Sequence, residues 1–174
     1  HRLKNDFKAG GKFTWQDPYR KHVYAADLES ILDLSGAMDR TIAEGIHTAE
    51  LYIITLGLIE TWRNKKNQLH ICNRPNTRNQ DVMDSVEFHL TGFSENYENM
   101  RRVCELIREH YPQRRIVLTV SPVGLKRTFR DIDVVVANAE SKSVLRAVAG
   151  QIEREFDNVT YWPSYELSLR HDIY

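Results

Sequence analysis

The residues best suited to chemistry stand at the end of an apolar run that begins at Leu51. Gly57 ends this run, and the carboxylate of Glu60 and the indole of Trp62 follow within five residues. In open α/β sheets, ligands bind just beyond the carboxyl ends of parallel strands. A glycine there lets its backbone N–H approach a bound group closely, although a strand end also needs a turn residue. We therefore predict a binding site here, with Gly57 as a ligand contact or as the turn itself.

Two further polar residues stand beside predicted strand and helix ends. Ser121 follows an apolar strand over residues 115–120 and precedes Pro122, which favours the start of a loop. A nucleophilic serine needs a nearby base, and the sequence shows none. Asn138 precedes a predicted helix over residues 141–156. It could cap this helix or lie in a turn, and capping is the favoured alternative. Both residues are also candidates for contacting a substrate.

Strands and helices alternate along the chain, which predicts the α/β class with a parallel sheet. Residues 1–24 are interpreted as mostly loop. Three strands are expected over 51–56, 115–120 and 159–162, and helices over 28–34, 38–46, 94–111 and 141–156, with a break at Ser35-Gly36 and a cap at Ser94. Residues 134–138 fit either an extended segment or the start of a helix. A hairpin of residues 61–63 and 69–71 and a short strand over 86–90 lie between them. The strand over 51–56 is apolar on both faces, which is typical of a central parallel strand.

Composition is that of an ordinary globular domain. The 174 residues match a single domain over residues 1–174, and 41% of them are hydrophobic. The 24 basic and 24 acidic side chains cancel, which argues against nucleic acid or an anionic membrane as a partner. The longest apolar run is too short to insert across a bilayer. Cys72 and Cys104 permit one disulfide but favour a reducing compartment, and helical spacing makes Cys104 a core residue.

Neither a metal nor a cofactor is expected. His70 and Cys72 alternate along one predicted strand, and with His89 they offer ligands that suit zinc. However, the sequence lacks Cys-x-x-Cys and His-Glu-x-x-His patterns, and it lacks the glycine loops that bind phosphate groups. We therefore predict no metal site and no cofactor.

Four motifs in consistent order resemble the GSCFA domain family over residues 27–166. They are Thr55-Leu56-Gly57 with Glu60 and Trp62, Thr119-Val120-Ser121-Pro122-Val123, Ala137-Asn138 with Ser141-Lys142 and Leu145-Arg146, and Pro163-Ser164-Tyr165-Glu166. The family is similar to the SGNH/GDSL-type hydrolases. This resemblance implies a flavodoxin-like, three-layer α/β sandwich with a parallel sheet, and it implies action on esters, often acyl groups on glycans.

The resemblance also implies roles for residues after the first strand. The backbone N–H of Gly57 would donate to the oxyanion that develops during acyl transfer. Glu60 accepts hydrogen bonds when ionised, so it would position a sugar hydroxyl or orient Arg63 rather than stabilise an oxyanion. The alternative for Glu60 is a solvated position in the hairpin. Trp62 would stack on a sugar ring. Near the last strand, Glu166 is expected to pair with Arg146 or Arg170.

Two features of such hydrolases are not in this sequence. The Gly-Ser-Cys-Phe-Ala motif, which occupies the position of the nucleophilic serine in that family, does not occur, and neither does an Asp-x-x-His pair after the last strand. We therefore expect a central fragment of the domain, incomplete at both ends and inactive as an esterase by itself.

The function implied is hydrolysis or transfer of an ester-linked acyl group, with a small-molecule or saccharide ester as substrate. The expected setting is the bacterial cytoplasm, with a saccharide or envelope polymer as the acyl carrier. The alternative is a non-catalytic carbohydrate-recognition module that keeps the cleft and Trp62. The sequence does not specify the acyl group, its acceptor or the oligomeric state.

Overall fold

The computed structural model describes residues 3–4, 15–20, 22–72, 74 and 80–169, and the chain divides into two compact units. One unit comprises residues 49–60 and 90–174, and we call it the parallel-sheet unit. The other comprises residues 1–48 and 61–89, and we call it the hairpin unit. The single domain expected over residues 1–174 stays a prediction.

The parallel-sheet unit contains the three strands that the sequence predicted. They are β4 (Leu51–Leu56), β8 (Arg115–Val120) and β9 (Val159–Trp162), arranged in the order β4-β8-β9. Both pairings are parallel, with Leu51 opposite Arg115 and Ile116 opposite Val159. Although β4 is apolar on both faces, a pattern typical of a central strand, it lies at an edge of the described sheet, and β8 is central.

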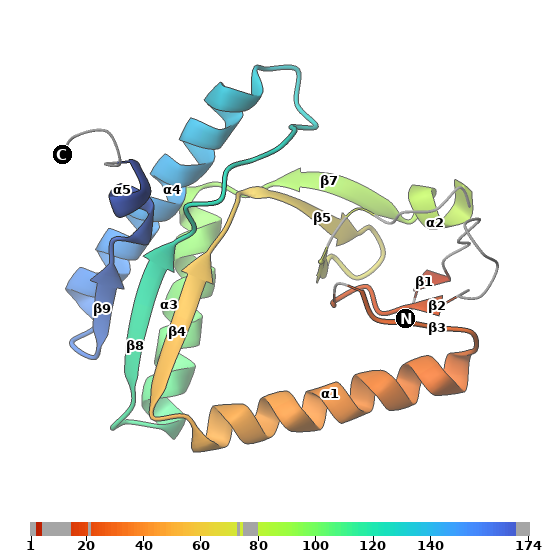
Figure 1. The fold of residues 1–174 in the computed structure, drawn as a ribbon, viewed down its shortest axis with the longest axis horizontal. Helices are drawn as coiled ribbons and strands as arrows, with labels where there is room; N and C mark the ends of the chain where they lie inside the picture. The colour runs from red at the N-terminus through yellow and green to blue at the C-terminus, as the bar shows by residue number, and fades with distance from the viewer. Residues whose placement is uncertain (1–2, 5–14, 21, 73, 75–79, 170–174) are drawn as a thin grey trace. The chain divides into compact units, whose positions relative to one another are not determined.

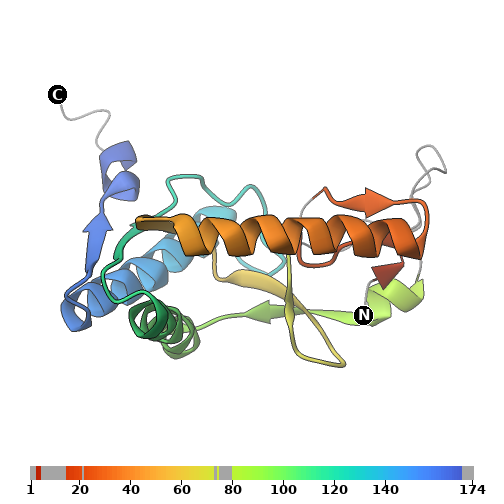
Figure 2. The ribbon, with the colours of Figure 1, turned by 90° about the horizontal axis from the view of Figure 1, so that it is seen from below.

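Two long helices cover one face of this sheet. Helices α3 (Phe93–His110) and α4 (Val134–Glu155) lie on the same side of the strands in both ribbon views (Figures 1 and 2). Their core comprises Met100 and Cys104 from α3, Val148, Ala149 and Ile152 from α4, Phe156, and Ile116, Leu118 and Val159 from the sheet. A short helix, α5 (Ser164–Leu169), follows β9. The α/β class with a parallel sheet is therefore confirmed, and the arrangement is consistent with a three-layer α/β fold.

The starts of α3 and α4 differ from the sequence-based expectation. Asp133 caps α4 by accepting a hydrogen bond from the backbone N–H of Val135 at 2.7 Å, so this helix begins seven residues before Ser141. The cap residue of α3 is Gly92, and Ser94 lies inside the first turn. Of the two alternatives for residues 134–138, the start of a helix is therefore the one observed, and Asp133 supplies its cap.

The hairpin unit is built from short strands and one long helix. Its N-terminal strands β1 (Leu3–Lys4), β2 (Trp15–Gln16) and β3 (Tyr24–Ala25) are antiparallel. The predicted hairpin is confirmed as β5 (Glu60–Asn64) and β6 (His70–Ile71), and β7 (Val86–Leu90) completes a sheet in the order β6-β5-β7 after the short helix α2 (Gln80–Asp84). Residues 5–14, within the segment interpreted as mostly loop, lie outside the described residues.

Helix α1 (Leu28–Thr48) runs unbroken through the predicted break at Ser35-Gly36. The Ser35 hydroxyl is buried and donates to a carboxylate oxygen of Asp17 at 2.7 Å, and Arg20 donates to the same oxygen at 2.6 Å. A glycine inside a helix costs only about 1 kcal/mol relative to alanine. The buried contact between Ser35 and Asp17 outweighs the tendency of Ser35-Gly36 to break a helix. The prediction of two separate helices was therefore wrong.

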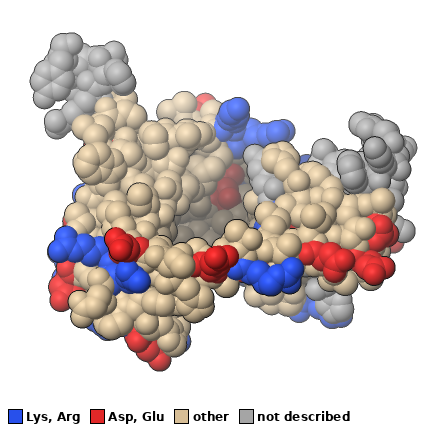
Figure 3. All heavy atoms as spheres, turned by 60° about the horizontal axis from the view of Figure 1, so that its bottom comes forward, with Lys and Arg blue, Asp and Glu red and all other residues tan. Residues whose placement is uncertain are grey.

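Charged side chains of both signs are interspersed on the face drawn in Figure 3. This distribution agrees with the formal net charge of zero. Of the helices that the structure describes, none combines the length and the apolar character needed to cross a bilayer.

Candidate functional site

The carboxyl ends of the three parallel strands meet at one edge of the sheet. The backbone N–H of Ser121 donates to the carbonyl of Leu56 at 2.9 Å, which places the end of β8 beside the end of β4. The hydroxyl of Ser164, just after β9, donates to the carbonyl of Val120 at 2.9 Å. The chain segments that follow β4, β8 and β9 therefore lie side by side, as the carboxyl ends of neighbouring parallel strands do.

Residues 57–59, which we call the strand-end segment, are held from two sides. Lys142 donates from Nζ to the carbonyl of Gly57 at 2.9 Å, and the Ser141 hydroxyl accepts from the N–H of Ile59 at 2.9 Å. Thr91 donates to the carbonyl of Ile59 from both its backbone N–H and its hydroxyl, at 3.0 and 3.1 Å. Helix α4 and Thr91 therefore fix the path of the chain directly after β4.

Two backbone donors in this segment have no partner. Within the part of the chain that the structure describes, the N–H groups of Gly57 and Leu58 donate to no acceptor. Gly57 is exposed, and a Cβ added to it would meet nothing within 4 Å. Open space thus borders Gly57, and two consecutive amides lack an acceptor among the described residues.

Lys142 is the most unusual residue near this edge. Only 1% of the surface of Lys142 is exposed. Among the described residues, its side chain makes one hydrogen bond, to the Gly57 carbonyl. Burial lowers the pKa of its ammonium group below the usual value because the charged form is desolvated. Lys142 was not among the predicted site residues, although its helical spacing from Leu145 and Val148 already placed it on the core face of α4.

Glu60 supports a neighbouring loop. Its carboxylate accepts from the hydroxyl of Thr128 at 2.5 Å and from the backbone N–H of Phe129 at 3.2 Å. The loop over residues 121–133 is therefore tied to the start of β5. One alternative expected Glu60 to orient Arg63. The structure instead pairs Arg63 with Glu87 at 2.6 Å. A contact between Glu60 and a substrate stays a prediction.

Asn138 ties down the same loop from helix α4. Its side-chain oxygen accepts from the backbone N–H of Leu125 at 2.9 Å. Asn138 lies inside the helix, so its expected capping role was wrong. Ser121, at the start of the loop, accepts from the N–H of Val123 at 3.2 Å. Substrate contacts by Asn138 and Ser121 stay predictions.

Trp62 belongs to the hairpin unit. Its ring meets Phe88 edge-on, with centroids 5.9 Å apart, and the guanidinium of Arg74 lies 5.6 Å from its centroid. Stacking of Trp62 on a sugar therefore stays a prediction. In the same unit the rings of His70 and His89 are 5.6 Å apart.

A second group of polar contacts joins α4 to the region after β9. Arg146 donates from Nε to Glu166 at 2.7 Å, which confirms one of the two predicted pairings, and its guanidinium lies 3.9 Å from the ring centre of Tyr161. The hydroxyl of Tyr161 donates to Glu166 at 2.8 Å. Burial, followed by this hydrogen bond, raises the pKa of Tyr161 to about 12.

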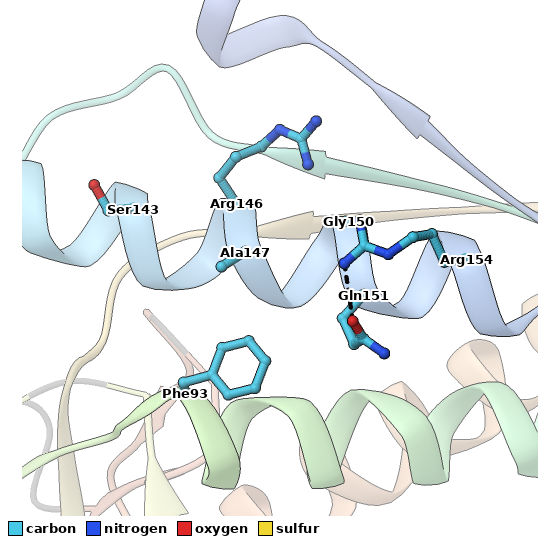
Figure 4. Close-up of a pocket in the computed structure, with 7 residues that line it drawn as sticks. All are labelled: Phe93, Ser143, Arg146, Ala147, Gly150, Gln151 and Arg154. Carbon is cyan, nitrogen blue, oxygen red and sulfur yellow. Dashed lines mark hydrogen bonds between the residues drawn. The ribbon is translucent and has the colours of Figure 1, made fainter.

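The outer side of α4 carries an open hollow of about 490 Å³. Figure 4 shows Phe93 of α3 on one side of it and the Arg154 side chain turned back toward Gly150. A Cβ on Gly150 would come within 2.8 Å of Nη1 of Arg146 and within 3.4 Å of Nη1 of Arg154. Gly150 thus makes room for two guanidinium groups that rest on the helix.

The fold and the converging strand ends define an α/β protein whose candidate site lies at the carboxyl edge of a parallel sheet. The model of the GSCFA family matches residues 5–173, and the chain belongs to this family. No curated protein and no solved structure matches the chain.

Proposed function

We propose that the carboxyl edge of the sheet serves the hydrolysis or transfer of an ester-linked acyl group, with a saccharide as acyl carrier. The observation that carries this proposal is a pair of consecutive amides, at Gly57 and Leu58, that have no acceptor among the described residues, together with open space beside Gly57. When a nucleophile attacks an ester carbonyl, negative charge develops on the carbonyl oxygen before the bond to the leaving alkoxide breaks. Fixed N–H donors stabilise that charge, and losing one such donor typically costs about 10²–10³ in kcat.

The rigidity of the segment supports the same function. An oxyanion site works because its donors need no reorganisation during the reaction. Ser141, Lys142 and Thr91 hold the backbone groups of Gly57 and Ile59, so the two amides are fixed before a substrate arrives.

A carbohydrate-recognition module is the second candidate, and one observation favours it. In the described residues of the parallel-sheet unit the sole histidine is His110, whose ring neighbours Tyr111 at the end of α3. The hydroxyl of Ser121 therefore has no imidazole base beside it among these residues. A module of this kind would bind the saccharide without turning it over.

The test uses the full-length protein with p-nitrophenyl acetate and with an acetylated saccharide. We expect turnover in the wild type and at least a roughly tenfold lower kcat/KM in Gly57→Val, because the new side chain fills the space beside the amides. Gly45→Ala in helix α1 is the control, since its Cβ also meets nothing within 4 Å. Wild-type kcat/KM in Gly57→Val would exclude Gly57 from the site. Saccharide binding without turnover, weakened by Trp62→Ala, would favour the recognition module.

A further inference from the structure

We infer that Lys142 is a positioning residue that acts through the peptide group between Gly57 and Leu58, making the Leu58 N–H the second donor of the oxyanion site. The inference rests on the proposed function and goes beyond it by naming that donor and its support. The contact that carries it is the 2.9 Å hydrogen bond from Nζ of Lys142 to the Gly57 carbonyl.

The carbonyl of Gly57 and the N–H of Leu58 belong to one planar, conjugated unit. An ammonium bonded to the carbonyl oxygen draws electron density away from the amide nitrogen, which makes the Leu58 N–H a stronger donor. Hydrogen bonds in such chains polarise one another, by about 10–30% per bond in condensed phases. A charged donor, as here, makes the first bond of the chain roughly twice as strong as a neutral one.

Burial makes the effect of Lys142 large at this point. Its side chain is enclosed between α4 and the end of β4, with 1% exposure, and no carboxylate among the described residues pairs with it. Water and counter-ions therefore do not screen the charge, and the Gly57 carbonyl receives its field directly. A buried charge without an ionic partner costs stability, and replacing such groups with apolar ones is often neutral or stabilising. A lysine at this position is thus hard to explain by stability alone.

The side chains near the segment do not supply the second donor. Glu60 is an acceptor when ionised, and its two oxygens are already bonded to Thr128 and Phe129. The amide oxygen of Asn138 is bonded to Leu125. A backbone donor strengthened from behind by Lys142 therefore fits this edge better than a side-chain donor.

The decisive variant is Lys142→Met, which has a similar volume and removes the charge. In the full-length protein with p-nitrophenyl acetate we expect kcat to fall about tenfold or more with KM changed less than about twofold, because the lost interaction matters in the transition state. Lys66→Met is the matched control, since Lys66 is exposed in the hairpin unit, and we expect wild-type kinetics from it.

A second readout does not depend on activity. In protein labelled with ¹⁵N-leucine, the Leu58 amide proton is expected to move upfield in Lys142→Met, and to shift on addition of acetate in the wild type but not in the variant. An unmoved Leu58 amide in a folded Lys142→Met protein would overturn the inference, whether or not the protein is an esterase. Active wild type with an unchanged kcat in the variant would overturn it too. Absence of turnover together with both NMR effects would reject the ester chemistry and retain the positioning role of Lys142.

If Lys142→Met does not fold, Lys142→Gln replaces it, since glutamine keeps an N–H donor and lacks the charge. A Leu58 amide shift and a kcat equal to those of the wild type in Lys142→Gln would overturn the inference. A Leu58 amide shift that differs from that of the wild type, together with a kcat in Lys142→Gln that lies between the wild-type value and zero, would support the inference.

Discussion

Replacing Ser141 with alanine should destabilise the protein although the change removes a single oxygen atom. The Ser141 hydroxyl accepts from the N–H of Ile59 at 2.9 Å, and both residues are buried, with 0% and 1% exposure. The variant leaves this N–H without an acceptor in the interior, which costs about 1–3 kcal/mol. Alanine has a higher helix propensity than serine and returns about 0.5 kcal/mol. We expect a net loss of about 0.5–2.5 kcal/mol in the free energy of unfolding.

The assay is urea unfolding followed by far-UV circular dichroism, with Ser143→Ala as the control. Ser143 lies two residues further along the same helix and is exposed. Both variants gain the same helix propensity, so their difference isolates the buried hydrogen bond. With an m-value of about 2 kcal/mol/M, the midpoint of Ser141→Ala should fall by roughly 0.25–1.25 M, while Ser143→Ala should match or slightly exceed the wild type.

Hydrogen exchange gives a residue-level check on the same reasoning. The Ile59 amide should exchange faster in Ser141→Ala than in Ser143→Ala, because only the first change removes its acceptor. Equal midpoints for the two variants, or unchanged protection of Ile59, would refute the view that Ser141 holds the strand-end segment.

Three further predictions concern a core thiol, the loop beside the site and a helical glycine. Burial raises the pKa of Cys104 from 9.0 to about 11, so its contribution to stability is complete below pH 9 and is lost as the pH rises toward 11. The loss amounts to roughly 2–3 kcal/mol, and urea midpoints at pH 8 and pH 10.5 should differ less in Cys104→Ala than in the wild type. Glu60→Gln weakens the contact with Thr128, so trypsin should cleave the loop that carries Thr128 faster than in the wild type; equal rates would count against the anchoring role. Replacing a helical glycine with alanine typically stabilises a helix by up to about 1 kcal/mol. In thermal unfolding, Gly150→Ala should stabilise the protein by less than Gly45→Ala, because only at Gly150 must the new Cβ displace a guanidinium group.

The secondary structure that builds the sheet could be predicted from the order of the amino acids. The apolar runs over residues 51–56, 115–120 and 159–162 have no helical alternative, because they are short and are bounded by Gly57, Pro122 and Pro163. Helical spacing likewise identified most of α3 and α4. Since parallel strands joined by helices place their carboxyl ends together, the position of the candidate site at this edge followed from the same pattern.

Tertiary structure alone decided what the side chains at that edge do. Ser141 meets Ile59 across 82 positions of sequence, Lys142 meets Gly57 across 85, and Glu60 meets Thr128 across 68. Hydrophobic periodicity reports which face of an element is buried, and it carries no information on which polar atom faces which across the core. The contact between Ser35 and Asp17 likewise kept α1 continuous through a local break signal. Periodicity therefore sufficed for the elements, and the partners of the buried polar groups were fixed only when those elements packed together.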